Sequence, residues 1–235
     1  MPLQNRVTPW GALEAVPTRY GVACAFGNRG GALHNSRKEI VKQWSSKAWL
    51  ACRMDGDKRT RKRQRDDNRA FNGRKRVVMR PGFYTELFFL DQYVATASGH
   101  RPCACCRRKE FVEFQAAWAR AHGDGKWSAG QMDTVLHSER TRPPCETELS
   151  ELPDGTFVSL EDEPRDAWLV WKGEILKWSH EGYGGERQPV SSVDAPVSLL
   201  TPASMVATMR CGFVPGDVHA SALTTPGPHG PVKRA

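Results

Sequence analysis

The sequence lacks any run of about 18 consecutive apolar residues, which is the length that a membrane-spanning helix requires. Its first 17 residues, MPLQNRVTPWGALEAVP, contain neither the apolar core nor the small-residue cleavage site of a secretory signal. No internal repeat stands out along the 235 residues. The composition, with 39% hydrophobic and 26% charged residues, is ordinary for a globular chain. We therefore expect a cytoplasmic protein with no membrane partner.

The sequence also lacks the cysteine pattern of a disulfide framework. It has seven cysteines, an odd number, and three of them fall between positions 103 and 106. In a chain without a secretory signal, such clustering is typical of metal ligation or of free thiols. The cysteines therefore indicate a site with chemistry of its own rather than covalent crosslinks.

Positive charge is concentrated in one segment. The chain carries a net charge of +8, and residues 57–80 alone contain 11 Lys or Arg against 3 Asp, a net of 11 − 3 = +8. Arg outnumbers Lys there, and the planar guanidinium suits bidentate contacts to phosphate. A solvated surface loop is the simpler interpretation of a charge run. We favour a loop that faces nucleic acid.

The pattern of apolar residues predicts an α+β protein. An N-terminal domain, with a small sheet and flanking helices, is expected over residues 1–125, and a basic arm is inserted at about 53–80. Strand-like runs between Pro-Asp-Gly and Lys-Gly turn signals then predict a β-rich domain over 126–222. Residues 223–235, rich in Pro and Gly, are expected to form a disordered tail.

Several local elements are predicted from apolar spacing and from cap residues. A strand is expected over 85–90, followed by a short helix over 92–98 with Asp91 as its N-cap and Gly99 after its end. Helical spacing also predicts a helix over 36–52. Two further helices carry similar signals, an aromatic stripe at Phe111, Phe114 and Trp118 in one and the caps Thr201, Pro202 and Gly212 in the other.

Cys103 and Cys106 form a C-x-x-C motif, and two chemistries use this spacing. A dithiol oxidoreductase places it at the start of a helix within a βαβ unit, and no such unit surrounds it here. A zinc site uses it because a tight turn lets two thiolates reach one tetrahedral ion, and zinc then needs two more ligands. We favour zinc as the cofactor.

The stretch ELFFLDQYVATASGHRPCACCRR, residues 86–108, resembles the second half of the metal-binding domain of the Ada DNA-repair proteins, which also occurs in nuclease-linked versions. The stretch FGNRGGALH, residues 26–34, is similar to the lead-in to the first ligand of the latter. The resemblance implies a zinc site made by His34, Cys52, Cys103 and Cys106, with Cys24 as the rival second ligand. His100 is expected to pack beside the site rather than bind the metal.

The sequence departs from the family in the spacing of these ligands, because 17 residues separate His34 from Cys52 and 50 more separate Cys52 from Cys103. Long loops are tolerable since closure entropy grows only logarithmically with length. The resemblance implies a module that binds DNA in repair, regulation or defence. A His as first ligand favours a binding module over a protein that accepts methyl groups on a thiolate.

Nucleic acid is the expected partner, DNA in preference to RNA. The residues expected to contact its phosphates lie in the basic arm and beside the C-x-x-C turn, and phosphate contacts position a protein without reading sequence. They are Arg59, Arg61, Lys62, Arg63, Arg65, Arg74, Lys75, Arg76, Arg101, Arg107 and Arg108.

Two other functions remain open. In a metal-dependent nuclease, His137, Glu139 and His180 would be the catalytic candidates, since histidine and acidic groups can hold a hydrolytic metal and activate water. Neither a His-Asn-His pattern nor a spaced acidic-lysine motif accompanies them. In a structural module, zinc would only stabilise the N-terminal domain, and the C-terminal strands would bind a protein partner.

Overall fold

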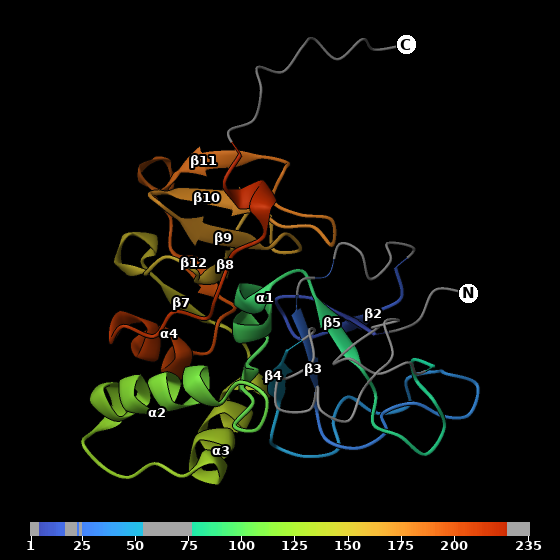
Figure 1. Ribbon diagram of the computed structural model, residues 1–235. Coiled ribbons are helices and arrows are strands. Elements are labelled where there is room, and N and C mark those ends of the chain that lie inside the picture. Colours follow the sequence, from blue (N-terminus) through green and yellow to red (C-terminus); the bar gives the residue numbers. More distant parts are fainter. Residues whose placement is uncertain (1–4, 17–22, 24, 54–76, 225–235) are drawn as a thin grey trace, which may run out of the picture.

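The computed structural model describes residues 5–16, 23, 25–53 and 77–224 of the chain (Figure 1). Within these residues it forms two six-stranded sheets and four α helices, an α+β fold whose C-terminal region is rich in β structure. This confirms the predicted fold class. The helices are α1 (Gln92–Ala97), α2 (Arg108–His122), α3 (Ala129–Arg140) and α4 (Ala203–Arg210).

The N-terminal sheet has the strand order β2-β1-β5-β3-β4-β6. Strand β3 lies between β5 and β4 and is antiparallel to both, whereas the edge strand β6 runs parallel to β4. The strands are β1 (Arg6–Val7), β2 (Leu13–Glu14), β3 (Ala25–Asn28), β4 (Leu50–Cys52), β5 (Leu87–Phe89) and β6 (Arg101–Pro102). This topology places three segments that are far apart in sequence, β3, β4 and β6, side by side.

The C-terminal sheet has the order β11-β10-β9-β8-β12-β7. Strands β8, β9, β10 and β11 follow one another as an antiparallel meander, and β12 returns to pair with β8 and β7. Its strands are β7 (Cys145–Thr147), β8 (Phe157–Ser159), β9 (Trp168–Trp171), β10 (Glu174–Lys177), β11 (Arg187–Pro189) and β12 (Val197–Leu199). Strand β8 thus follows the Pro-Asp-Gly turn signal, and the Lys-Gly signal separates β9 from β10, as the sequence predicts.

The two sheets share a hydrophobic core. Helix α1 lies at their junction (Figure 1), and one cluster of buried side chains joins Phe89 of β5 and Val94 of α1 to Phe157 of β8 and Leu169 of β9. A second cluster unites α2 with α3 and α4. The predicted boundary between residues 125 and 126 therefore falls within continuous packing. Residues 225–235 of the predicted tail lie outside the described residues.

Several local predictions are confirmed. Strand β5 lies within 85–90, and the Asp91 carboxylate caps α1 by accepting a hydrogen bond from the Val94 backbone at 2.9 Å. Gly99, with φ of +80°, follows that helix in the left-handed conformation that favours glycine. The aromatic stripe of α2 is buried against α3 and α4, as an amphipathic helix requires.

Two local predictions are wrong. Residues 36–52 form turns followed by β4 rather than a helix, because Leu50–Cys52 hydrogen-bond to β3 and β6 and sheet pairing outweighs helical spacing. Thr201 is not the N-cap of α4, which is Pro202. The Thr201 hydroxyl instead accepts a hydrogen bond from the Phe157 backbone at 2.8 Å and so ties the helix entrance to β8.

A buried polar cluster joins the N-terminal turns to β6. The Arg29 guanidinium stacks on the Trp49 ring at 3.7 Å from its centroid, donates to the Gly11 carbonyl at 2.7 Å and donates to His100 Nε2 at 3.2 Å. Because His100 Nε2 accepts this hydrogen bond, its Nδ1 carries the proton and donates to the Ser98 hydroxyl at 2.9 Å. The fully buried imidazole is therefore held neutral.

This cluster leads to a prediction about acid stability. Burial, together with the charges of Arg29 and Arg140, lowers the pKa of His100 well below its ordinary value of 6.5. Below pH 6.5 the unfolded chain binds a proton at His100 that the folded chain does not bind. The free energy of unfolding therefore falls as the pH falls. For one such histidine the slope approaches about 1.4 kcal/mol per pH unit.

The measurement is urea unfolding between about pH 7.5 and pH 5, for the wild type and for His100→Gln. Glutamine can keep both hydrogen bonds without titrating, and loss of a thiolate-bound metal in acid would affect both proteins alike. We expect the wild type to lose stability more steeply below pH 6.5. Equal slopes in the two proteins would contradict this role of His100.

Candidate metal centre

Three cysteine thiols meet at one end of the N-terminal sheet. The sulfur atoms of Cys52, Cys103 and Cys106 lie within 4.8 Å of one another. Cys52 ends β4, Cys103 follows β6, and Cys106 lies in the turn that leads into α2. Cys52 and Cys103 are buried, at 7% and 8% exposure, and Cys106 is half-buried. The structure thus brings together three of the four predicted ligands.

Backbone pairing explains how residues so far apart in sequence meet. Strand β6 runs parallel to β4, and the Cys103 N–H donates to the Ala51 carbonyl at 2.9 Å, which sets Cys103 beside Cys52. On the other side, Gly27 of β3 faces β4 so closely that a Cβ there would lie 2.3 Å from the Leu50 carbonyl oxygen. Glycine at 27 is therefore required for β4 to approach.

The C-x-x-C turn brings the third sulfur into place. The Arg107 N–H donates to the Cys103 carbonyl at 2.9 Å, which closes the turn before α2 begins. The backbone N–H groups of Cys105 and Cys106 point to the Cys103 sulfur, and that of Arg53 points to the Cys106 sulfur. Donors directed at sulfur favour the thiolate form.

The thiols perturb each other strongly. Hydrogen bonds from Cys106 and Cys52 lower the pKa of Cys103, so its thiolate is the acceptor of the group. Donation to Cys103 and Cys106, together with burial, raises the pKa of Cys52, and donation to Cys103 raises that of Cys106 to about 11. Three adjacent sulfurs cannot all ionise unless a cation compensates their charge. The cluster therefore has the electrostatics of a cation site.

The donor set fits a thiophilic metal. Zinc binds thiolate sulfur at about 2.3 Å, so two sulfurs of one tetrahedral site lie roughly 3.8 Å apart, which is compatible with the limit of 4.8 Å found here. Soft thiolates select zinc, copper(I) or iron–sulfur chemistry over magnesium and calcium. Sequence reasoning missed Asn28, whose side-chain amide lies 3.8 Å from the Cys52 sulfur. Its approach to Cys52 depends on the pairing of β3 with β4, which no sequence pattern reveals.

His34 lies outside this cluster, although the resemblance implies it as a ligand. It is buried, with Nδ1 at 2.6 Å from the Thr85 hydroxyl and Nε2 at 3.2 Å from the Arg80 carbonyl. A carbonyl only accepts, so Nε2 carries the proton and Nδ1 accepts from Thr85. In this arrangement neither ring nitrogen is free to bind a metal. Cys24, the rival ligand, lies outside the described residues.

His100 and Cys105 are also apart from the cluster. Both ring nitrogens of His100 are engaged, by Arg29 and by Ser98, so it is not a ligand, and its neighbours are these residues rather than the thiols. Cys105 lies between two cluster residues in sequence, yet its thiol is exposed. It therefore serves as an internal control for the cysteines that form the cluster.

Two arginines predicted to contact phosphate are instead buried and bind other residues of the protein. Arg101 is buried and makes a bidentate ion pair with Asp133 of α3, with both N–O distances at 2.8 Å. Arg107 is also buried, and its guanidinium donates to the Gln92 side chain and to the Pro215 carbonyl. Their role is therefore structural: they fasten the C-x-x-C turn to α3 and to the C-terminal segment.

Arg108 is exposed at the first turn of α2, immediately after the thiol cluster. The predicted contacts of the basic arm, Arg59, Arg61, Lys62, Arg63, Arg65, Arg74, Lys75 and Arg76, lie outside the described residues. Both ends of that arm are nevertheless placed. Cys52, just before it, and Val78 and Met79, in its last residues, belong to one buried cluster that also contains Cys103. The arm therefore starts and ends beside the three thiols.

The candidates for a hydrolytic metal are dispersed. His137 of α3 stacks edge-on against Trp44, with ring centroids 5.3 Å apart, and Glu139 accepts hydrogen bonds from the backbone and hydroxyl of Ser204 at the start of α4. His180 contacts Glu14, with 2.8 Å between Nε2 and the carboxylate oxygen. Among the described residues, the three cysteines form the sole group of three or more metal-binding side chains.

Comparison of the chain with protein-family models, with characterised proteins and with solved structures gives no match. Within the described part of the chain, none of the helices combines the length and the apolar character needed to cross a membrane.

Proposed function

We propose that this protein binds zinc and nucleic acid, DNA in preference to RNA, in the cytoplasm. The observation that carries the proposal is the meeting of Cys52, Cys103 and Cys106 at one point of the sheet. Three thiolates leave one position of a tetrahedral zinc ion, to be filled by a further side chain or by water. The metal would fasten β4, β6 and the start of α2 together. Such an arrangement is what the resemblance to Ada-like metal-binding domains implies.

The distribution of charge supports nucleic acid as the partner. Residues 57–80 carry a net charge of +8, and the buried side chains at both ends of this segment pack with the thiol cluster. Arg108 and Lys109 add exposed positive charge at the same place, with the Lys109 side chain 86% exposed. A zinc-fastened anchor would hold the basic segment against phosphates, and its contacts would carry little sequence preference.

The experiment is to titrate labelled duplex DNA and duplex RNA into the protein at several salt concentrations. The test variant replaces the ten Lys and Arg residues between 58 and 76 with Gln, which keeps the length of the segment. We expect DNA affinity to fall by more than about tenfold, because each lost phosphate contact removes about 0.9 from the slope of log affinity against log salt.

Arg108→Ala should weaken DNA binding mildly, whereas Arg165→Ala, an exposed arginine in the loop between β8 and β9, should leave it unchanged. Unaltered affinity and salt slope in the Gln-substituted variant, with its zinc retained, would refute nucleic-acid binding through this segment. Cleavage of DNA on addition of magnesium or manganese would instead favour a nuclease. Absence of nucleic-acid binding by the zinc-loaded wild type would favour a structural module.

A further inference from the structure

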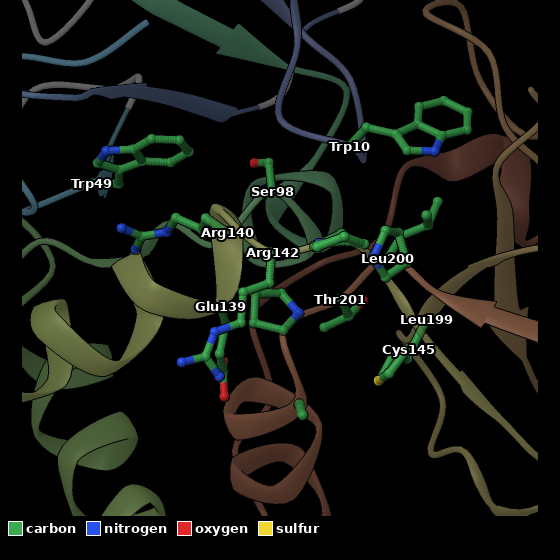
Figure 2. Close-up of a pocket in the computed structure, with 15 residues that line it drawn as sticks. Trp10, Trp49, Ser98, Glu139, Arg140, Arg142, Cys145, Leu199, Leu200 and Thr201 are labelled. Atoms are coloured by element: carbon green, nitrogen blue, oxygen red, sulfur yellow. The ribbon is translucent and has the colours of Figure 1, made fainter.

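A cavity of about 360 Å³ lies apart from the thiol cluster, where the turn around Trp10, the end of α3 and the link between β12 and α4 meet (Figure 2). Small-molecule sites usually enclose about 300–1,000 Å³, so this cavity is large enough for one compact ligand. Its lining includes Trp10, Trp49, Ser98, Arg140, Arg142, Pro143 and Leu200.

The wall of this cavity carries an excess of positive charge. Arg140 stacks on Trp49, with its guanidinium carbon 4.4 Å from the ring centroid, and Arg29 stacks on the same indole at 3.7 Å. Arg142, also in the lining, is exposed. Glu139 is the single carboxylate among the lining residues, and its oxygens already accept hydrogen bonds from Ser204. An anionic ligand would therefore be favoured.

Arg140 retains a donor that the surrounding protein does not use. Its terminal nitrogens donate to the carbonyls of Gly99 and Lys47, but its Nε is buried without a hydrogen-bond partner among the described residues. Burial lowers the pKa of Arg140 to about 9, so it remains a cation at neutral pH. Arg142 has no ion-pair partner within the same part of the chain. Arg142 is thus available to bind an anion, and Arg140 adds positive charge to the same wall.

The same cavity offers flat apolar surface. Figure 2 shows Trp10 and Trp49 at opposite sides, with Ser98 between them and Arg140 beside Trp49. Trp10 is 39% exposed, and its ring is held edge-on against Trp178 at 6.5 Å between centroids. Its turn is anchored from within, because Arg29 donates to the Gly11 carbonyl. A fixed, exposed indole is a stacking platform for a planar ring.

We infer that this cavity binds a single nucleotide, with the base against Trp10 and the phosphate at Arg142. Guanidinium groups bind phosphate through charge-assisted hydrogen bonds, and an indole accepts any base because every base has a flat π face. A free mononucleotide and an unpaired nucleotide of a strand share this chemistry. The second source rests on the proposed nucleic-acid function, whereas the first is independent of it.

The test titrates AMP, adenosine and a five-nucleotide single-stranded DNA into the full-length protein, with calorimetry as the readout. We expect saturable binding of AMP and about tenfold weaker binding of adenosine, which lacks the phosphate. Arg142→Ala and Trp10→Ala should each weaken AMP binding by about tenfold. Arg165→Ala removes an exposed arginine away from the cavity and should have no effect.

Each outcome has a defined meaning. If AMP binds and its binding depends on Trp10 and Arg142, the ligand is a free nucleotide. If only the oligonucleotide binds with this dependence, the ligand is an unpaired nucleotide of a strand. Absence of saturable binding of both, or binding that is unchanged in both variants, overturns the inference. AMP binding without duplex binding would refute the proposed function and leave this site standing. Duplex binding without saturable binding of AMP or of the oligonucleotide would do the reverse.

Discussion

Replacing Cys103 with alanine is expected to abolish zinc binding and to lower the melting temperature by more than about 10 °C. Three segments, the ends of β4 and β6 and the start of α2, meet at the three thiols. Structural zinc contributes about 10–16 kcal/mol in zinc-finger peptides, and in a chain of this size each lost kcal/mol lowers the melting temperature by about 2–4 °C. Partial loss of this stabilisation is enough for the expected shift.

The measurement is zinc content per chain, together with thermal unfolding with and without a chelator. Cys52→Ala and Cys106→Ala should behave like Cys103→Ala, whereas Cys105→Ala, in the same turn but exposed, should keep both zinc and stability. Equal zinc content in Cys105→Ala and Cys103→Ala, whether full or absent in both, would contradict the role of the cluster.

The same measurement identifies the fourth ligand. The resemblance implies that His34→Ala loses zinc, whereas the hydrogen bonds of His34 to Thr85 and Arg80 imply that zinc is retained. Cys24→Ala tests the remaining cysteine that the sequence suggested. Zinc loss in one of these two variants would assign the ligand, and retention in both would leave water or another side chain at the fourth position.

The sequence predicted the cysteines of the site better than the histidine, and the reason is physical. The C-x-x-C spacing fixes two sulfurs in one turn, so Cys103 and Cys106 follow from local geometry. Cys52 joins them only because β4 pairs with β6, which no local pattern reveals. His34 is separated from the cluster by turns whose path depends on Thr85 and on a bridge to Ile40. A side chain on such a loop cannot be placed from spacing alone.

A similar limit applies to the arginines. Arg101 and Arg108 look alike in a sequence as neighbours of the C-x-x-C motif, yet one is buried in an ion pair and the other is exposed. The partner of Arg101 is Asp133, which lies 32 residues away on α3. A contact over this distance along the chain cannot be predicted from a local sequence pattern. Burial decides between structural and binding roles, and burial is a property of the fold.

The ion pair of Arg101 gives the second large expected effect. Asp133→Ala is expected to lower the free energy of unfolding by about 3–5 kcal/mol, because it leaves a buried guanidinium without its counter-charge. Both side chains are shielded from solvent, at 5% and 7% exposure, so the surrounding water cannot compensate. Urea unfolding of the wild type and the variant measures the change.

The control is the double variant Arg101→Met with Asp133→Leu, in which two apolar side chains of similar size replace the pair. Apolar replacement of a buried ion pair is often neutral or stabilising, so this variant should recover most of the stability that Asp133→Ala loses. If the double variant were as unstable as Asp133→Ala, hydrogen bonding by Arg101, including its bond to the Pro102 carbonyl, would matter more than charge pairing.

Because Arg101 lies two residues before Cys103, zinc content in these variants also shows whether the ion pair positions the metal site. Full zinc content in Asp133→Ala, despite its lower stability, would mean that the three thiols and their own turn are sufficient.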